Sequence, residues 1–290
     1  MRRVLTAIAL TGILASCGTA QTNSPSEVNS NNNKRNNKEI VGTFLGAVAK
    51  QDAETMRKFA NADYIQHNPF VPTGLEPFIQ LLPILKEHGT YAENVRMFQD
   101  GNYVFMHNIW KNAKPFGADE MVAFDVIRVD ENGKVAEHWD AMMVQTQPNA
   151  SGRTLTDGAI EISDLYKTEE NKATIKALWA ILINGSQEEV GEIAMKTFIP
   201  NYKQHNPNAG DGVQALFKAF GEQQWKIKKL HKVIGEGNFV LSISEGSVKD
   251  KPAVFYDLFR LENGKVAEHW DVIQEIPTEG LAHNNGMFGF

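Results

Sequence analysis

The chain reads Glu131-Asn132-Gly133-Lys134-Val135-Ala136-Glu137-His138-Trp139-Asp140, and the same ten letters return unchanged at residues 262–271. An identical run of this length does not arise by chance within one chain of 290 residues. Self-similarity at a fixed spacing is the sequence signature of a repeated structural unit. The sequence therefore predicts two copies of one fold.

Matches on either side of this stretch define the extent of each copy. Three further pairs of segments match in the same order: 64–69 with 202–207, 101–104 with 237–240, and 124–128 with 256–260. We expect repeat one to span residues 38–147 and repeat two residues 168–278. Each repeat then has the size of a small domain with a single core.

Apolar spacing predicts helices at the start of each repeat. Helical spacing is seen in two sets: Ile40, Val41, Phe44, Leu45, Val48 and Ala49, and Ile175, Leu178, Trp179 and Leu182. Asp52 and Ser186 are suited to cap second helices. A third helix is expected over residues 75–88, interrupted at Pro83, and over 213–220 in repeat two.

Strands are expected after the helices. The β-rich runs are 94–99, 102–110, 121–129 and 134–145, and in repeat two 227–234, 239–244, 253–261 and 265–275. Asn263-Gly264 is a strong hairpin signal. Helices followed by antiparallel strands predict an α+β fold in which helices cover one face of a curved, mainly antiparallel sheet.

The segments outside the repeats have distinct compositions. Residues 148–167 form a turn-rich linker that we expect to lie against the repeats, and residues 279–290 form a C-terminal tail. Residues 17–37 are rich in Ser, Thr and Asn, which is typical of a flexible tether.

The first residues have the pattern of an export signal. Arg2 and Arg3 precede a short apolar stretch, and Leu14-Ala15-Ser16-Cys17 has the form of a lipobox. We expect residues 1–16 to be removed and Cys17 to be acylated, which would anchor the exported protein to the bacterial envelope. Gly18 favours the outer membrane, facing the periplasm. The alternative is an ordinary signal peptide that is cleaved a few residues later.

Charge and cysteine content exclude several classes of function. The net charge is −6 and no Lys/Arg-rich run is present, so binding driven by nucleic-acid phosphates is not expected. The single cysteine excludes an intrachain disulfide. The sequence contains no Gly-rich phosphate loop and no nucleophile-elbow motif.

Three motifs that occur in both repeats resemble those of the SnoaL-like family. They are His-Asn-Pro at 67–69 and 205–207, the Phe/Tyr-Asp-x-x-Arg strand, and Gly-Lys-Val-Ala-Glu-His-Trp-Asp. This family is part of the nuclear transport factor 2-like superfamily, and the likeness is closest to its polyketide-cyclase or aldol-condensation-like members. The resemblance covers both repeats and implies two tandem cone-shaped domains.

The His-Trp-Asp motif carries an acid/base pair on one side of a strand. Side chains two residues apart share a face, so His138 and Asp140 point together and Trp139 points away. A carboxylate buried in an apolar site has a raised pKa and can accept a proton near neutral pH. The resemblance implies that Asp140 and Asp271 take this role, with assistance from His138 and His269.

The same resemblance predicts which side chains line the pockets. They are Tyr64, His67 and Asn68 in repeat one and Tyr202, His205 and Asn206 in repeat two. His107 aligns with Ile243, so repeat one has the richer site if His107 faces the pocket. Arg128 and Arg260 are expected to form structural ion pairs.

Several readings stay open at this point. The His and Asp side chains could satisfy one another in a buried polar cluster without chemistry. Counting from the Asn263-Gly264 turn places Asp257 beside Trp270, facing away. The same count in repeat one is shifted by one residue, so one repeat should carry a bulge and the facing of Asp125 and Asp257 is undecided. A His67, His138 and Asp140 metal set is a weaker alternative, because it lacks short ligand spacing.

We expect a cofactor-independent enzyme, without a bound metal, that acts as a cyclase, isomerase or aldol-type catalyst on a small carbonyl compound. The alternatives are an envelope lipoprotein that binds a small apolar ligand without chemistry, and an interaction protein with vestigial pockets. Export argues against the cytoplasmic polyketide biosynthesis in which such cyclases work. The two repeats are expected to pair as an internal pseudo-dimer.

Overall fold

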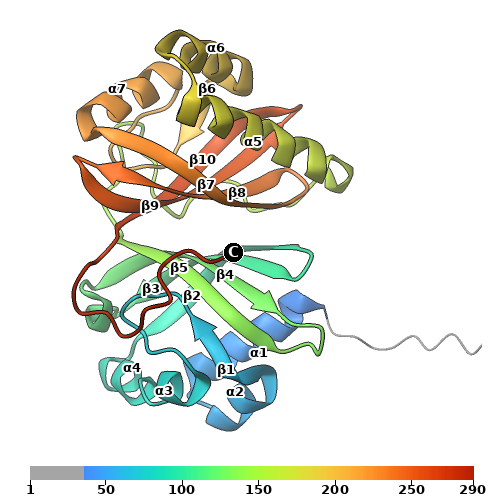
Figure 1. Cartoon of the computed structure of the whole chain (residues 1–290), viewed down its shortest axis with the longest axis vertical. Coiled ribbons are helices and arrows are strands. Elements are labelled where there is room, and N and C mark those ends of the chain that lie inside the picture. Colours follow the sequence, from blue (N-terminus) through green and yellow to red (C-terminus); the bar gives the residue numbers. More distant parts are fainter. Residues whose placement is uncertain (1–35) are drawn as a thin grey trace, which may run out of the picture. The chain divides into compact units, whose positions relative to one another are not determined.

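The computed structural model describes residues 36–290 of the chain (Figure 1). The predicted signal peptide, Cys17 and the predicted tether as far as residue 35 lie outside the described residues. Among residues 36–290, no helix is both long enough and apolar enough for a membrane crossing.

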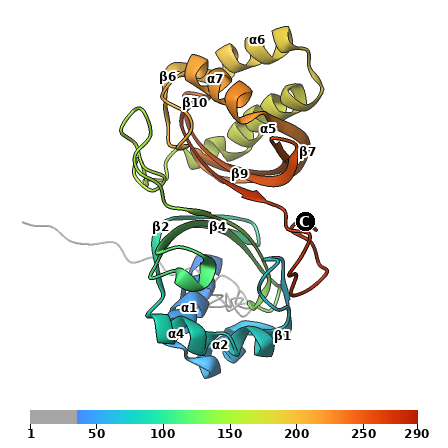
Figure 2. The same ribbon diagram turned by 90° about the vertical axis from the view of Figure 1, so that its left-hand side faces the viewer.

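Repeat one packs its helices on one side of a five-stranded sheet (Figure 2). Its elements are α1 (Asn37–Lys50), α2 (Ala53–Phe59), β1 (Ala60–Gln66), α3 (Leu75–Ile79), α4 (Leu82–His88), β2 (Tyr91–Asp100), β3 (Tyr103–Lys111), η1 (Lys114–Phe116), β4 (Glu120–Val129) and β5 (Val135–Val144). The strand order is β1-β5-β4-β3-β2. Only β1 is parallel to its neighbour within this sheet.

Repeat two has the same architecture. Its elements are η2 (Leu165–Lys167), α5 (Thr168–Asn184), α6 (Gln187–Thr197), β6 (Phe198–Gln204), α7 (Val213–Gln223), β7 (Trp225–Glu236), β8 (Phe239–Val248), β9 (Lys251–Glu262) and β10 (Lys265–Glu275). The strand order β6-β10-β9-β8-β7 repeats that of the first sheet. The predicted α+β fold with a mainly antiparallel sheet is confirmed for both repeats.

The helix signals in the sequence are confirmed. Asp52 caps α2 by accepting a hydrogen bond from the backbone N–H of Thr55, at 3.0 Å. Ser186 and Glu189 form a capping box at the start of α6. The expected break near Pro83 separates α3 from α4, and the proline lies in the first turn of α4, where a missing N–H leaves no hydrogen bond unmade.

The sequence analysis predicts no strand before the His-Asn-Pro motif, yet β1 and β6 occupy that position. Helix α2 passes directly into β1, and Gln66 pairs in parallel register with His138 of β5. Residues 60–63 read Ala-Asn-Ala-Asp, which contains no strong strand former. The strand is set by its place beside β5, and it brings the segment 64–68 next to the His-Trp-Asp strand.

A β-bulge in each repeat decides which way the β4 and β9 aspartates face. Glu262 pairs with Lys265 across the predicted Asn263-Gly264 turn, but the register shifts at Ala267, so Asp257 lies opposite Asp271. Repeat one has the same shift at Ala136, which places Asp125 opposite Asp140. The expectation that one repeat carries a bulge is therefore wrong, because both do, and the facing of Asp125 and Asp257, which the sequence left undecided, is the same in the two repeats.

The face of each sheet that the helices leave open contributes to a shared core. Strands β5 and β10 contact each other, as do β2 and β7. Trp139 and Phe124 of repeat one lie in the same apolar cluster as Trp270 and Tyr256 of repeat two. Each sheet therefore has one face under its own helices and one face in this shared core.

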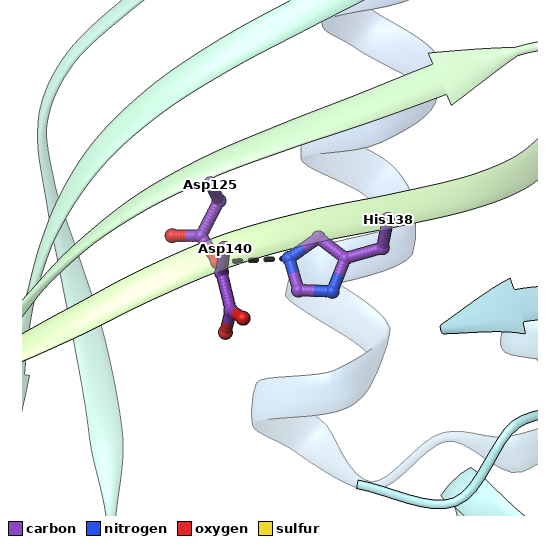
Figure 3. Close-up of side chains that lie close together, drawn as sticks. All are labelled: Asp125, His138 and Asp140. Carbon is purple, nitrogen blue, oxygen red and sulfur yellow. Dashed lines mark hydrogen bonds and ion pairs between the residues drawn. The ribbon is translucent and has the colours of Figure 1, made fainter. Parts of the chain in front are cut away.

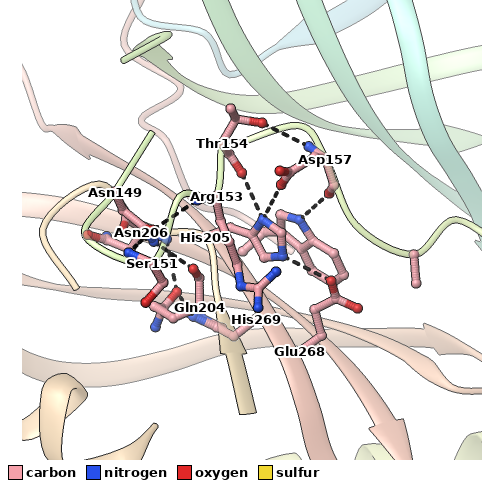
Figure 4. A network of polar contacts seen from close by, with 12 residues as sticks. Asn149, Ser151, Arg153, Thr154, Asp157, Gln204, His205, Asn206, Glu268 and His269 are labelled. Carbon is pink, nitrogen blue, oxygen red and sulfur yellow. Dashed lines mark hydrogen bonds and ion pairs between the residues drawn. The ribbon is translucent and has the colours of Figure 1, made fainter. Parts of the chain in front are cut away.

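The segment between the repeats lies against repeat two, as expected (Figure 4). Asn149 donates hydrogen bonds from Nδ2 to the carbonyls of Gln204, at 2.6 Å, and Ala209, at 2.9 Å. The carbonyl oxygen of Thr154 lies 2.7 Å from Nδ1 of His205. These contacts hold the linker over the end of β6.

The C-terminal tail makes the equivalent contacts on repeat one. The carbonyl oxygen of Gly286 lies 2.8 Å from Nδ1 of His67, and Phe290 stacks on Trp139 with ring centroids 4.4 Å apart. Met287 is buried in the shared core. Each repeat is thus covered by the segment that follows the other repeat in the chain.

Replacing Met287 should show how much the tail contributes to stability. Met287 is 4% exposed, so Met287→Ala should cost about 2–4 kcal/mol and lower the melting temperature by roughly 5–10 °C. Leu281→Ala is the matched control, because Leu281 is 43% exposed and its loss should cost less than about 0.5 kcal/mol. Thermal unfolding followed by circular dichroism measures both, and equal shifts would contradict a seated tail.

Candidate functional site

Two aspartates and a histidine meet on the helix-covered face of the first sheet (Figure 3). Asp125 lies on β4, and His138 and Asp140 lie on β5. The bulge at Ala136 places the two aspartates opposite each other, while Trp139 points into the shared core. The sequence prediction that His138 and Asp140 share a face away from Trp139 is confirmed.

His138 lies between two hydrogen-bond acceptors. Its Nε2 is 3.0 Å from Oδ1 of Asp125, and its Nδ1 is 2.9 Å from Oε1 of Gln66. The Gln66 oxygen is identified by its other partners, the backbone N–H groups of His67 and Asn68, which donate to it. Because both ring nitrogens face acceptors, His138 is held as the doubly protonated cation.

Asp140 has one oxygen that is bonded and one that is free. Asn68 donates a hydrogen bond from Nδ2 to Oδ2 of Asp140, at 2.8 Å. The other oxygen, Oδ1, is buried and has no hydrogen-bond partner among the described residues. A buried carboxylate oxygen without a partner is costly, so it marks a place where a ligand or proton can be accepted.

A cavity of about 90 Å³ lies over this cluster. Its polar wall contains Tyr64, Gln66, Asn68, Asp125, His138 and Asp140. The rest of the wall is mainly apolar and includes Phe44, Phe78, Trp110 and Phe116. The arrangement is a small apolar chamber with a carboxylate pair and a phenol at one end.

Burial changes the proton affinity of these groups. Desolvation raises the pKa of Asp140 to about 6, and the charge of Asp125 adds to this although His138 and Asn68 act against it. Burial lowers the pKa of His138, but the Asp125 hydrogen bond and the charges of Asp140 and Asp125 outweigh it and raise the pKa overall. Burial also raises the pKa of Tyr64, which therefore stays protonated and can donate.

Repeat two brings the equivalent residues together. His269 lies with Nδ1 3.0 Å from Oε1 of Gln204 and Nε2 3.1 Å from Oδ1 of Asp257. Desolvation is the main cause that raises the pKa of Asp271 to about 6. A cavity of about 210 Å³ adjoins this cluster, and Asp257 and His269 are the polar residues in its wall.

The structure places the predicted pocket residues in two groups. Tyr64 and Asn68 line the cavity of repeat one. Tyr202 and Asn206 are buried beside Gln204 and Asp271 and do not line the cavity of repeat two.

The predicted histidines outside the His-Trp-Asp motif lie on the other side of their sheets. His67 stacks on Trp139 with ring centroids 4.8 Å apart, and His205 stacks on Trp270 at 4.6 Å. His107 is buried with Nδ1 2.7 Å from Nη1 of Arg96, and burial lowers its pKa. All three are therefore outside the cavities that they were expected to line.

The glutamines and one asparagine were missed by the sequence analysis. Gln66 and Gln204 fix the histidines of the site, and they stand inside the Tyr-x-Gln-His-Asn-Pro match that the two repeats share. Asn108 donates from Nδ2 to Oδ2 of Asp125 at 2.7 Å. It aligns with Ser244, so comparison of the repeats gave no signal for it.

The two arginines of the Phe/Tyr-Asp-x-x-Arg strand form ion pairs, as predicted. Arg128 lies 2.8 Å from Oε2 of Glu137, and Arg260 lies 2.9 Å from Oε2 of Glu268. Glu137 also lies 2.9 Å from Nε2 of His67. These charges are therefore neutralised within the shared-core side of each sheet and do not reach the cavities.

The side chains that could hold a metal ion differ from the set considered in the sequence analysis. Oxygen and nitrogen atoms of Asp125, His138 and Asp140 lie within 4.8 Å of one another, whereas His67 is on the opposite face. A histidine binds a metal through the lone pair of a ring nitrogen, and both ring nitrogens of His138 already face hydrogen-bond acceptors. The hydrogen bonds thus favour proton chemistry at this cluster.

Comparisons with known proteins give similarity at the level of one repeat. No family model matches the chain, and no curated protein matches it. Among solved structures, IdmH of Streptomyces antibioticus, called a "putative polyketide cyclase", is 19% identical over 37% of this chain and 92% of that chain, with a TM-score of 0.32. An NTF2-like protein of unknown function from Cytophaga hutchinsonii is 15% identical over 37% and 90%, with a TM-score of 0.32.

Because the pKa of Asp140 is raised, we expect Asp140→Asn to increase the stability of the fold in a pH-dependent way. The folded chain keeps the carboxyl proton up to about pH 6, whereas the unfolded chain loses it near about pH 4. The folded state therefore binds more protons in this interval, and stability falls as pH rises through it. We expect Asp140→Asn to be close to the wild type near pH 4 and to be about 2–3 kcal/mol more stable at pH 8.

Urea unfolding at the two pH values measures this difference. Asp63→Asn serves as the control, because Asp63 is exposed on β1 and its replacement should change stability little at either pH. A variant that is less stable than the wild type at pH 8 would mean that the Asp140 carboxylate stabilises the fold.

Proposed function

We propose that the chain is a cofactor-independent acid–base enzyme that moves a proton next to the carbonyl group of a small substrate. Cyclase, isomerase and aldol-type reactions all begin with this step. The observation that carries the proposal is the free oxygen of Asp140, which is buried at the end of an apolar cavity. A carboxylate there is a stronger base than one in water, because burial raises its pKa to about 6.

In the proposed step, Oδ1 of Asp140 takes a proton from the carbon beside the substrate carbonyl. The C–H bond breaks, its electron pair forms the enolate, and the negative charge moves to the carbonyl oxygen. Asn68 holds the second oxygen of Asp140, which fixes the direction of the free one. The same carboxyl group then returns the proton to the substrate or passes it to another position.

Tyr64 and His138 have supporting roles in this proposal. The hydroxyl of Tyr64 accepts a hydrogen bond from Nε2 of Gln66, at 3.2 Å, so its own proton is available for the enolate oxygen. The cationic His138, paired with Asp125, offsets the charge of ionised Asp140. Asp271 and His269 are the acid/base pair that the sequence predicts for repeat two, and their surroundings differ from those of Asp140 and His138.

The second candidate is a non-catalytic lipoprotein of the envelope that binds a small apolar ligand. The larger and almost wholly apolar cavity of repeat two favours it, because such a chamber can hold a ligand by burial alone. The two candidates differ in what Asp140→Asn does. If the protein is only a binder, Asp140→Asn still binds the ligand, and neither the wild type nor the variant exchanges a substrate hydrogen.

Deuterium exchange into 2-butanone tests the enzyme directly. In D₂O an enzyme of this kind replaces the hydrogens beside the carbonyl with deuterium, and NMR follows the loss of signal. We expect the rate to rise with pH through about 6, as Asp140 ionises, and to fall at least about 100-fold in Asp140→Asn.

Asp63→Asn is the matched control and should exchange 2-butanone at the wild-type rate. Stabilisation of Asp140→Asn by the ketone would show that binding is kept. Exchange at equal rates in wild type and Asp140→Asn would refute the proposed base.

We further propose that the protein is exported and held at the outer membrane, facing the periplasm, by lipid on Cys17. The lipobox supports this, and the contacts between β5 and β10 support the expected internal pseudo-dimer. In a Gram-negative host, the full chain should incorporate labelled palmitate and sediment with membranes, and Cys17→Ser should do neither. Processing and release of both forms would favour an ordinary signal peptide.

A further inference from the structure

The two repeats share every residue of the Asp-His-Asp cluster, but they leave different carboxylate oxygens free. In repeat one, both oxygens of Asp125 are engaged, one by His138 at 3.0 Å and the other by Asn108 at 2.7 Å. The buried oxygen left without a partner is Oδ1 of Asp140, on β5.

Repeat two reverses this arrangement. Asn206 donates from Nδ2 to both oxygens of Asp271, each at 2.8 Å. Ser244 replaces Asn108 beside the other aspartate, and its short side chain makes no hydrogen bond to it. The free buried oxygen among the described residues of this cluster is therefore Oδ2 of Asp257, on β9.

The free oxygen belongs to a residue that lines the larger cavity. Asp257 and His269 are in the wall of the cavity of about 210 Å³, and Asp271 is not. The remaining wall is apolar and includes Leu182, Val190, Leu216 and Phe217. A ligand that fills this space has a long apolar body and places a polar group at Asp257.

Repeat two lacks two bulky side chains that narrow the cavity of repeat one, one through a substitution and one through a shorter loop. Trp110, which lines that cavity, aligns with Gly246, where a Cβ would collide with the carbonyl oxygen of Lys226. Phe116 comes from the loop that contains η1, whereas β8 and β9 of repeat two are joined by a tight turn at Lys249 and Asp250. Repeat two therefore lacks the two bulky aromatic side chains that stand in the wall of the first cavity.

We propose that repeat two is a second proton-transfer site, in which Asp257 and not Asp271 is the base, for carbonyl compounds with a long apolar chain. This inference rests on the proposed function. Oδ2 of Asp257 takes the proton beside the carbonyl, the C–H electron pair forms the enolate, and the carboxyl group returns a proton to the same carbon. In D₂O the returned atom is deuterium, because the carboxyl proton exchanges with solvent.

Hydrogen–deuterium exchange of 2-butanone and of 2-nonanone, measured with the full chain and its variants, distinguishes the two sites. Asp140→Asn should lower 2-butanone exchange at least about 100-fold and 2-nonanone exchange less than about 3-fold. Adding Asp257→Asn should abolish 2-nonanone exchange, whereas adding Asp271→Asn should leave it within about 5-fold. The proposal would be overturned if Asp140→Asn alone abolished 2-nonanone exchange. It would also be overturned if adding Asp271→Asn abolished this exchange and adding Asp257→Asn did not.

A second variant tests the free oxygen without removing the carboxylate. Ser244→Asn supplies the amide that repeat one uses on Asp125, so it should occupy Oδ2 of Asp257 and reduce 2-nonanone exchange at least about 10-fold. Thermal unfolding confirms that each variant is folded. Unchanged exchange in a folded Ser244→Asn chain would argue against Asp257.

A binding measurement distinguishes this proposal from the proposed function. Thermal stabilisation by 2-nonanone should persist in Asp140→Asn and disappear in Leu216→Trp, which fills the half-buried wall of the second cavity. If the wild type exchanges 2-butanone but not 2-nonanone, only the second site fails. If it exchanges neither ketone, the proposed function fails and the Asp257 base fails with it.

Discussion

The β-bulge at Ala136, repeated at Ala267, is the constraint on which both sites depend. It sets two residues of β5 or β10 against one residue of the neighbouring strand, so the alternation of faces slips by one position. Asp125 and Asp257 then point under the helices, where His138 and His269 meet them. Without the slip, each carboxylate would enter the shared apolar core, and an unpaired charge there costs several kcal/mol.

Much of the fold could be predicted because the chain repeats itself. The helices follow the spacing of residues such as Phe44 and Trp179, and the hairpin follows Asn263-Gly264. The bulges could not be predicted, because an alanine at a bulge looks like any alanine in a strand. Strand β1 was missed for a related reason: its first residues have no preference for a strand, and their partner on β5 is about 75 residues away in the chain.

The sequence predicted how His138 and Asp140 face, but not which residues of the His-Asn-Pro segment face the cavity. His138 and Asp140 face together because they are two apart on one strand, and this rule needs no tertiary information. His67 and Asn68 are neighbours, so in an extended segment they point to opposite sides: Asn68 reaches Asp140, and His67 reaches Trp139. Nothing in the motif itself says which of the two faces the cavity.

The two repeats have the same His-Trp-Asp motif, but the carboxylates around it have different hydrogen-bond partners. The difference lies on β3 and β8. Asn108 of β3 donates a hydrogen bond to Asp125, whereas Ser244 of β8 makes none to Asp257, and Trp110 of β3, which lines the first cavity, aligns with Gly246 of β8. Conserving a motif while changing the strand next to it alters which carboxylate oxygen is left without a hydrogen-bond partner. Comparison of motifs alone would assign the two halves the same chemistry.

Because each repeat is covered by a segment that follows the other repeat, the order of synthesis affects when each repeat can be completed. The residues that cover His67 and Trp139 follow repeat two in the chain, whereas those that cover His205 follow repeat one. Repeat one is made first, yet its covering segment is made only after all of repeat two. Repeat two, made second, finds its cover already synthesised. The order in which the halves emerge is therefore the reverse of the order in which they can be completed. A fragment of residues 148–290 would keep the segment that covers repeat two, whereas repeat one cut out alone would lose its cover.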